Sequence, residues 1–250
     1  MLSARTEAKS LVQALSLSAA IVIPVFLFAQ WGPDDGLLER FATLLGGRVF
    51  DGGYIQFMTY VAFFWSFLEI REKREVLRRE RKMFRKKLLP TNEKHLLMAD
   101  EIRDLQFRMS DMEKNGPSLL VSMIKKACTK FRSTQSIPEV LEIISIQTEI
   151  NKEKAESEQS TIRYLTWVIP SIGFIGTVLG ISEALMVANS GDMEVITATL
   201  GVAFDTTLIA LILSIVIMWF FHGLQEETDQ LHASIKEYVV ENLVNKIEVE

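Results

Sequence analysis

Residues 164–182 read YLTWVIPSIGFIGTVLGIS and contain no charged side chain. Three other stretches are similarly apolar: the charge-free stretches between Lys9 and Asp34 and between Asp51 and Glu69, and the stretch between Glu194 and Glu226, which only Asp205 and His222 interrupt. A helix needs roughly 20 mostly apolar residues to cross a hydrocarbon core of ~30 Å. One such run is compatible with a buried helix of a soluble protein, but four favour a membrane protein. The sequence therefore predicts an all-α membrane protein with four transmembrane helices, at about 11–31, 52–69, 164–188 and 195–221.

The charges between these spans predict the orientation of the chain. Residues 71–87, REKREVLRRERKMFRKK, carry ten basic and three acidic side chains beside the second span, and such clusters stay on the cytoplasmic side of a membrane. The loop between the first two spans is mainly acidic (Asp34, Asp35, Glu39 and Asp51 against Arg40 and Arg48), and the turn 189–194 has no basic residue. We therefore expect a multi-pass protein with cytoplasmic N- and C-termini. The first span is expected to be retained, because FLFAQW at 26–31 offers no small-x-small cleavage site.

The chain divides into four predicted parts. They are a first transmembrane hairpin at 1–70, a cytoplasmic helical region at 71–160, a second hairpin at 161–224 and a cytoplasmic tail helix at 225–250. Breaks are expected at 89–92, 115–118 and 133–138, with a capping box formed by Ser136 and Glu139, and the last cytoplasmic helix should run directly into the third span. In the tail, apolar residues recur every fourth position and predict an amphipathic helix that packs on other helices: Leu231, Ile235, Val239, Leu243 and Ile247.

Signals of enzymatic chemistry are missing from the sequence. The three histidines, His95, His222 and His232, have no metal-spaced partners, and there is no phosphate-binding loop. A single cysteine, Cys128, excludes a disulfide within the chain. The basic run 71–87 lacks interleaved aromatic residues, so it is better explained by topology and anionic lipid than by nucleic acid. We expect no enzyme, no cofactor and no metal site.

Polar residues inside the last two spans give the strongest functional signal. Thr177 and Thr207 both lie ~15–18 Å below the outer surface at ~1.5 Å per residue, so they share a level near the bilayer midplane. A carboxylate at the depth of Asp205 costs at least ~2.5 kcal/mol and normally faces protein or water. Because Asp205 lies two positions from Thr207, the two side chains point to nearly opposite faces of the helix. A structural role for Asp205 and a direct role in ion passage both remain open.

The glycines of the third span are interpreted as packing residues. Gly173, Gly176 and Gly180 do not have the spacing of a dinucleotide-binding fingerprint. Gly176 and Gly180 form a small-xxx-small pair, which lets transmembrane helices approach closely.

The last two spans resemble the MotA/TolQ/ExbB proton-channel family. Residues 170–181, PSIGFIGTVLGI, resemble the family stretch P-x-x-G-x-x-G-T-V-x-G-I, and residues 203–211, AFDTTLIAL, resemble the segment in which a family threonine faces the ion path. The resemblance covers roughly residues 161–224. It places the two family threonines on Thr177 and Thr207 and the inner proline on Pro170, whereas Asp205 departs from the best-known members. Four spans resemble MotA, and the GTV stretch is closer to TolQ and ExbB.

This resemblance implies a channel subunit of a bacterial inner-membrane motor. It implies a homo-pentamer around two copies of a single-span partner of the MotB/TolR/ExbD kind, which couples a flow of H⁺ or Na⁺ to mechanical work. The alternative is a membrane scaffold that gathers partners through its cytoplasmic helices without transport; it has no reason to accept the desolvation of the polar residues in the spans. A secondary transporter is disfavoured because the span pairs show no internal repeat. The sequence leaves open which ion flows and which process is powered.

Overall fold

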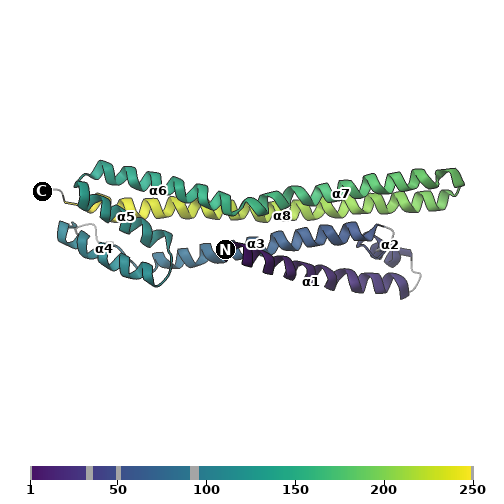
Figure 1. Ribbon diagram of the computed structural model, residues 1–250, viewed down its shortest axis with the longest axis horizontal. Coiled ribbons are helices and arrows are strands. Elements are labelled where there is room, and N and C mark those ends of the chain that lie inside the picture. The colour runs from purple at the N-terminus through teal and green to yellow at the C-terminus, as the bar shows by residue number, and fades with distance from the viewer. Residues whose placement is uncertain (1, 32–35, 49–51, 91–95, 249–250) are drawn as a thin grey trace. The chain divides into compact units, whose positions relative to one another are not determined.

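The computed structural model describes residues 2–31, 36–48, 52–90 and 96–248, and these residues are almost entirely helical (Figure 1). The α-helices are α1 (Leu2–Trp31), α2 (Gly36–Leu44), α3 (Gly53–Phe84), α4 (Ala99–Lys114), α5 (Leu119–Thr134), α6 (Ile137–Glu158), α7 (Ser160–Val187) and α8 (Met193–Asn242). Two short 3-10 helices, η2 (Ala188–Ser190) and η3 (Val244–Lys246), follow α7 and α8. The predicted features that fall on Asp34, Asp35, Asp51, Thr91, Asn92 and His95 lie outside the described residues.

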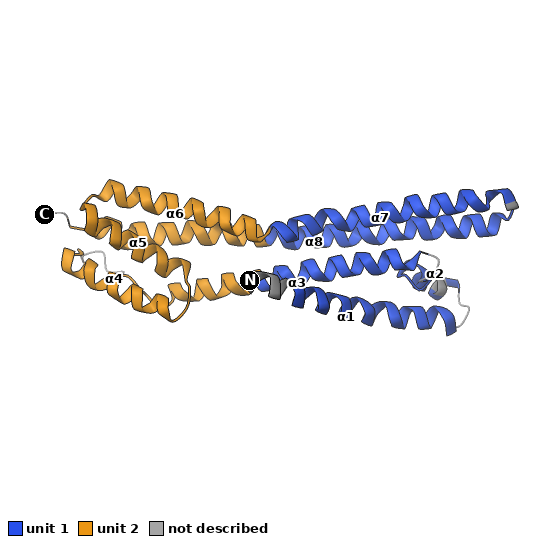
Figure 2. Ribbon diagram, viewed as in Figure 1, with its two compact units in different colours: residues 1–72, 160–223 blue, residues 73–159, 224–250 orange. Residues whose placement is uncertain are grey.

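The helices form two compact units (Figure 2). Unit 1 comprises residues 1–72 and 160–223, and unit 2 comprises residues 73–159 and 224–250. Helices α3 and α8 each contribute residues to both units. Each unit therefore joins segments that are far apart in the sequence.

Three helical segments of the described chain are long and apolar enough to cross a membrane. They are Ala8–Trp31, Ile137–Val187 and Met193–Lys246. They include three of the four predicted spans. The predicted span at 52–69 lies in α3 but does not reach the same mean hydropathy.

Polar residues that face the interior of unit 1 explain the lower hydropathy of α3. Gln56, Thr59 and Ser66 are fully buried, and Tyr60 is nearly so. Thr59 and Ser66 donate to carbonyls one turn back in α3, while Gln56 and Tyr60 donate to the carbonyls of Leu44 and Leu45, at 3.2 Å each. Mean hydropathy depends on residue type alone, so these polar residues lower the value for α3 even though their side chains are buried. In α3, Gln56 and Tyr60 instead hold the end of α2 and the segment that follows it by hydrogen bonds to backbone carbonyls.

The core of unit 1 is built from α1, α3 and α8. Val22, Tyr60 and Ile209, one from each helix, form a buried apolar cluster. In the middle of α3, the buried Glu69 carboxylate accepts a hydrogen bond from the Ser10 hydroxyl of α1 at 2.5 Å. The first helix is thus joined to α3 by apolar packing and by a polar contact.

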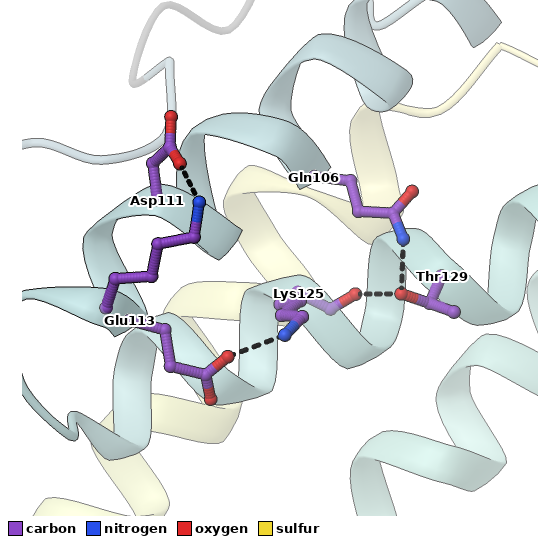
Figure 3. Close-up of polar contacts among 6 residues, drawn as sticks. Gln106, Asp111, Glu113, Lys125 and Thr129 are labelled. Atoms are coloured by element: carbon purple, nitrogen blue, oxygen red, sulfur yellow. Dashed lines mark hydrogen bonds and ion pairs between the residues drawn. The ribbon is translucent and has the colours of Figure 1, made fainter.

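In unit 2, α5 packs against α4 on one side and against α6 on the other. The predicted break at 115–118 is confirmed: α4 ends at Lys114, and the Ser118 hydroxyl caps α5 by accepting from the Val121 amide at 3.5 Å. Polar contacts join α4 to α5, and Figure 3 shows two of them: Lys125 pairs with Glu113 at 2.6 Å, and the Gln106 amide donates to the Thr129 hydroxyl at 2.8 Å. Such exposed contacts fix the register more than they add stability.

The tail contributes its apolar stripe to unit 2. Leu231, Ile235, Val239, Leu243 and Ile247 are all buried, as their spacing predicts. Beyond η3, Leu97 and Ile247 form a parallel β-bridge, with the Leu97 amide donating to the Lys246 carbonyl at 2.6 Å. This bridge ties the segment before α4 to the residues after α8.

Two local predictions are wrong. No separate tail helix begins at 225, because α8 is one helix of 50 residues that ends at Asn242. Ser136 makes no side-chain cap, and Glu139 instead pairs with Lys130 at 2.6 Å, so the capping box does not form. As predicted, the last helix before the third span leads directly into it: Gln159 alone separates α6 from α7, and its side-chain amide donates to the Thr228 hydroxyl at 3.1 Å.

Candidate functional site

Helices α7 and α8 form an antiparallel hairpin in which glycines allow close contact (Figure 1). A Cβ atom added to Gly173 would overlap Ala210, one added to Gly176 would overlap Thr206, and one added to Gly180 would lie 2.5 Å from the Ala203 Cβ. All three glycines therefore face α8 at distances that no larger residue permits. Their predicted position at a helix contact is where the structure places them.

The two predicted threonines lie together in this hairpin. The Thr177 and Thr207 hydroxyls are hydrogen-bonded to each other across α7 and α8. Both also bond to the Gly173 carbonyl, from Thr207 at 2.9 Å and from Thr177 at 3.3 Å. Two residues thirty positions apart thus form one polar group at one level of the hairpin.

Pro170 lies inside α7, in the N-terminal half of the helix. Because proline has no amide hydrogen, the helix loses one backbone hydrogen bond here. One turn earlier, the Thr166 hydroxyl donates to the Arg163 carbonyl at 2.7 Å. The structure places Pro170 about one turn before the glycine–threonine stretch and away from its hydroxyls.

Asp205 does not join the threonine pair. Its carboxylate is bound by the Arg40 guanidinium of α2 through two hydrogen bonds, of which the one from Nη2 to Oδ1 is 2.7 Å long. The Asp205 side chain is 3% exposed, whereas the Arg40 side chain is 56% exposed. A bidentate arginine contact is among the strongest ways to compensate a buried carboxylate. The carboxylate thus connects α8 to the short helix between α1 and α3.

The sequence did not identify Arg40 as a site residue. In the sequence analysis, Arg40 is only one of two basic residues in the acidic loop between the first two spans. A buried carboxylate requires a compensating partner, which was a usable signal, but the sequence does not say which basic residue supplies it.

Two cavities flank the N-terminal part of α8 within unit 1. One, of about 390 Å³, lies between α2 and the start of α8, with Arg40, Arg48 and Glu194 in its lining. The other, of about 240 Å³, lies between the start of α3 and the α7–α8 hairpin, with Gly176, Gly180 and Thr206 in its lining. The described residues contain no group of His, Cys, Asp or Glu side chains that could hold a metal ion.

These features define a class of protein: a multi-helix membrane protein with a close-packed hairpin that carries hydroxyls and a compensated carboxylate within its apolar length. The model of the MotA/TolQ/ExbB proton channel family matches residues 116–237. The match confirms the resemblance and extends it from the hairpin into α5 and α6. No curated protein and no solved structure matches the chain significantly.

The matched family has a general function. The family implies a proton-channel subunit of an energy-transducing motor in the inner membrane, which generally works with a single-span partner of the MotB/TolR/ExbD type. The family consists of channel and transducer proteins, not of enzymes. The threonine pair lies inside the matched segment.

Proposed function

We propose that this chain is the ion-channel subunit of a bacterial inner-membrane motor that couples a flow of H⁺ or Na⁺ to mechanical work. The chain forms a homo-pentamer around a dimer of a single-span MotB/TolR/ExbD-like partner. The observation that carries the proposal is the contact between Thr177 and Thr207 inside the family-matched hairpin. Their hydroxyls form a polar level past which the ion moves, and the protein needs no cofactor besides that ion.

The proposed topology has four spans, with residues 52–69 as the second. Two buried polar residues of α3 support it, because Gln56 and Tyr60 donate to backbone carbonyls within unit 1 and their donors need not face lipid. Asp205 enters the proposal through Arg40: the pair holds α2 against α8 beside the ion path. Both termini and unit 2 lie in the cytoplasm, as the basic residues 71–87 favour.

Replacing either threonine by valine tests the proposed path. Thr177→Val and Thr207→Val keep the side-chain size and remove the hydroxyl, so insertion and assembly should persist. Ion flux through the pentamer–partner complex should fall about tenfold or more, the range expected when a hydrogen bond to a charged species is lost. Flux is measured in vesicles as partner-dependent acidification or Na⁺ uptake.

Thr166→Val is the matched control, because Thr166 lies in the same helix, is buried, and bonds within α7 to the Arg163 carbonyl. Its flux should equal that of the wild type. Wild-type flux in all three variants would show that the threonine pair serves packing alone, whereas the absence of flux from the wild-type complex would favour the scaffold alternative.

A further inference from the structure

The cavity between α3 and the α7–α8 hairpin is unusually polar for the apolar part of a membrane protein. It has a volume of about 240 Å³, and its lining includes the side chains of Glu183, Thr199, Thr206 and Tyr54. A cavity that offers several oxygen atoms in a space larger than one water molecule is expected to be hydrated. An apolar cavity of that size would stay dry.

The polar side chains follow the length of the cavity. Glu183 lies seven residues after Gly176 in α7, and Thr199 lies seven residues before Thr206 in α8. The cavity therefore extends along ~10 Å of each helix at ~1.5 Å per residue. Glu183 is exposed and makes no hydrogen bond or ion pair with any described part of the chain. An unpaired carboxylate at a cavity entrance raises the local concentration of cations.

The inner end of the cavity is connected to the threonine pair. The Ala203 carbonyl accepts a hydrogen bond from Thr206 at 2.7 Å and another from Thr177 at 3.4 Å. Thr177 in turn bonds to Thr207. One carbonyl therefore links a hydroxyl in the cavity lining to both hydroxyls of the pair.

We propose that this cavity is a hydrated access path that admits a monovalent cation from the outer side of the membrane, past Glu183, to the level of Thr177 and Thr207. The proposal rests on the proposed ion-conducting function and adds to it a route within one subunit. Glu183 attracts the cation, and Thr199 and Thr206 provide oxygens along the way. The small residues of the hairpin leave the backbone and these hydroxyls within reach of water.

Cysteine accessibility to Ag⁺ tests the path without requiring ion flux. Ag⁺ is a monovalent cation that reacts with thiols, and it is added in nitrate medium to the outer side of membranes containing the full chain. Thr199→Cys and Thr206→Cys should both react, measured by mass as thiols protected from later alkylation. The wild type serves as the blank, because Cys128 is buried and burial raises the pKa of its thiol to about 12.

Ser214→Cys is the matched control. Ser214 is a buried residue of α8, two turns further along the helix than Thr206 and absent from the cavity lining. Its cysteine should stay unreactive. Equal reaction at Ser214→Cys, or no reaction at both threonine positions in correctly inserted protein, would overturn the path while leaving the valine experiment on ion flux unaffected.

The role of Glu183 is tested in the Thr206→Cys background. Glu183→Gln should slow the Ag⁺ reaction roughly two- to tenfold, the range expected for one charge ~10 Å away at effective dielectric constants between those of water and a protein surface. Glu194→Gln, which removes a carboxylate from the other cavity, should leave the rate unchanged. Equal rates in both variants would remove Glu183 from the proposal. Reaction in a protein that conducts no ion would instead contradict the proposed function and leave a hydrated cavity.

Discussion

Asp205 and Arg40 share one ion pair but differ in exposure, and the difference predicts an asymmetry between their variants. Arg40→Ala leaves a carboxylate that is 3% exposed without its partner, at a cost of about 3 kcal/mol, the lower end for broken buried pairs. Asp205→Asn removes the negative charge and leaves the Arg40 side chain, which is already exposed, without its ion pair. We expect this variant to lose about 1 kcal/mol of stability. The stabilities are measured by unfolding of the purified protein in detergent.

The double variant Arg40→Ala/Asp205→Asn provides the internal control. It should be about as stable as Asp205→Asn alone, because no charge is left to compensate. Additive losses would indicate that the two residues stabilise the protein independently. The contact between them would then have no energetic role.

At the scale of residues, the sequence predicted what depends on position along a helix. The common level of Thr177 and Thr207 followed from counting residues in two antiparallel spans, and their contact agrees with it. The different direction of Asp205 followed from the helical period. The partner of Asp205 did not follow, because Arg40 lies 165 positions away and its approach depends on how α2 folds back.

At the scale of elements, the closeness of α7 and α8 predicts a substitution and its suppressor. Gly173→Ala should destabilise the hairpin by about 1–3 kcal/mol, the usual cost of overpacking, because the new methyl would overlap Ala210. Ala210→Gly in the same chain removes the opposing methyl and should restore much of the loss. Thermal inactivation of the solubilised protein measures both effects.

Gly201→Ala is the control for helix propensity. Gly201 lies in α8, and a Cβ atom there would meet nothing within 4 Å. Its replacement should be neutral or slightly stabilising. A loss at Gly201 equal to that at Gly173 would show that the glycines act through backbone flexibility and not through contact.

Helix boundaries were predictable where a residue type enforces them, and less so elsewhere. The Asn115–Ser118 break was correct because Gly116, Pro117 and a capping Ser118 act locally. The continuity of α8 was not predicted, since a change from apolar to charged composition after residue 224 looks like a boundary. An apolar part and a charged, amphipathic part can belong to one helix when the two parts pack in different units, as they do in α8.

At the scale of the whole molecule, the four-span topology predicts the location of three reporters. Fusions near Asn115 and after Glu250 should report the cytoplasm, and a fusion near Leu45 should report the periplasm. Paired alkaline phosphatase and fluorescent-protein fusions measure this, since each is active on one side. A periplasmic signal near Asn115 would contradict the four-span topology and the assignment of α3 as a span.

The division of unit 2 between two distant parts of the sequence has a consequence for synthesis. Residues 73–159 leave the ribosome before the hairpin, and the stretch of α8 that covers them follows only after residue 223. Synthesis of the intervening residues 160–223 at about 5–20 residues per second takes roughly 3 to 13 s, and during this time the apolar surface of residues 73–159 is uncovered. During that interval chaperones compete for the same surface. Completion of unit 2 then requires that both helices of the hairpin have been synthesised, so a protease that removes uncovered helices would also remove chains whose hairpin is incomplete.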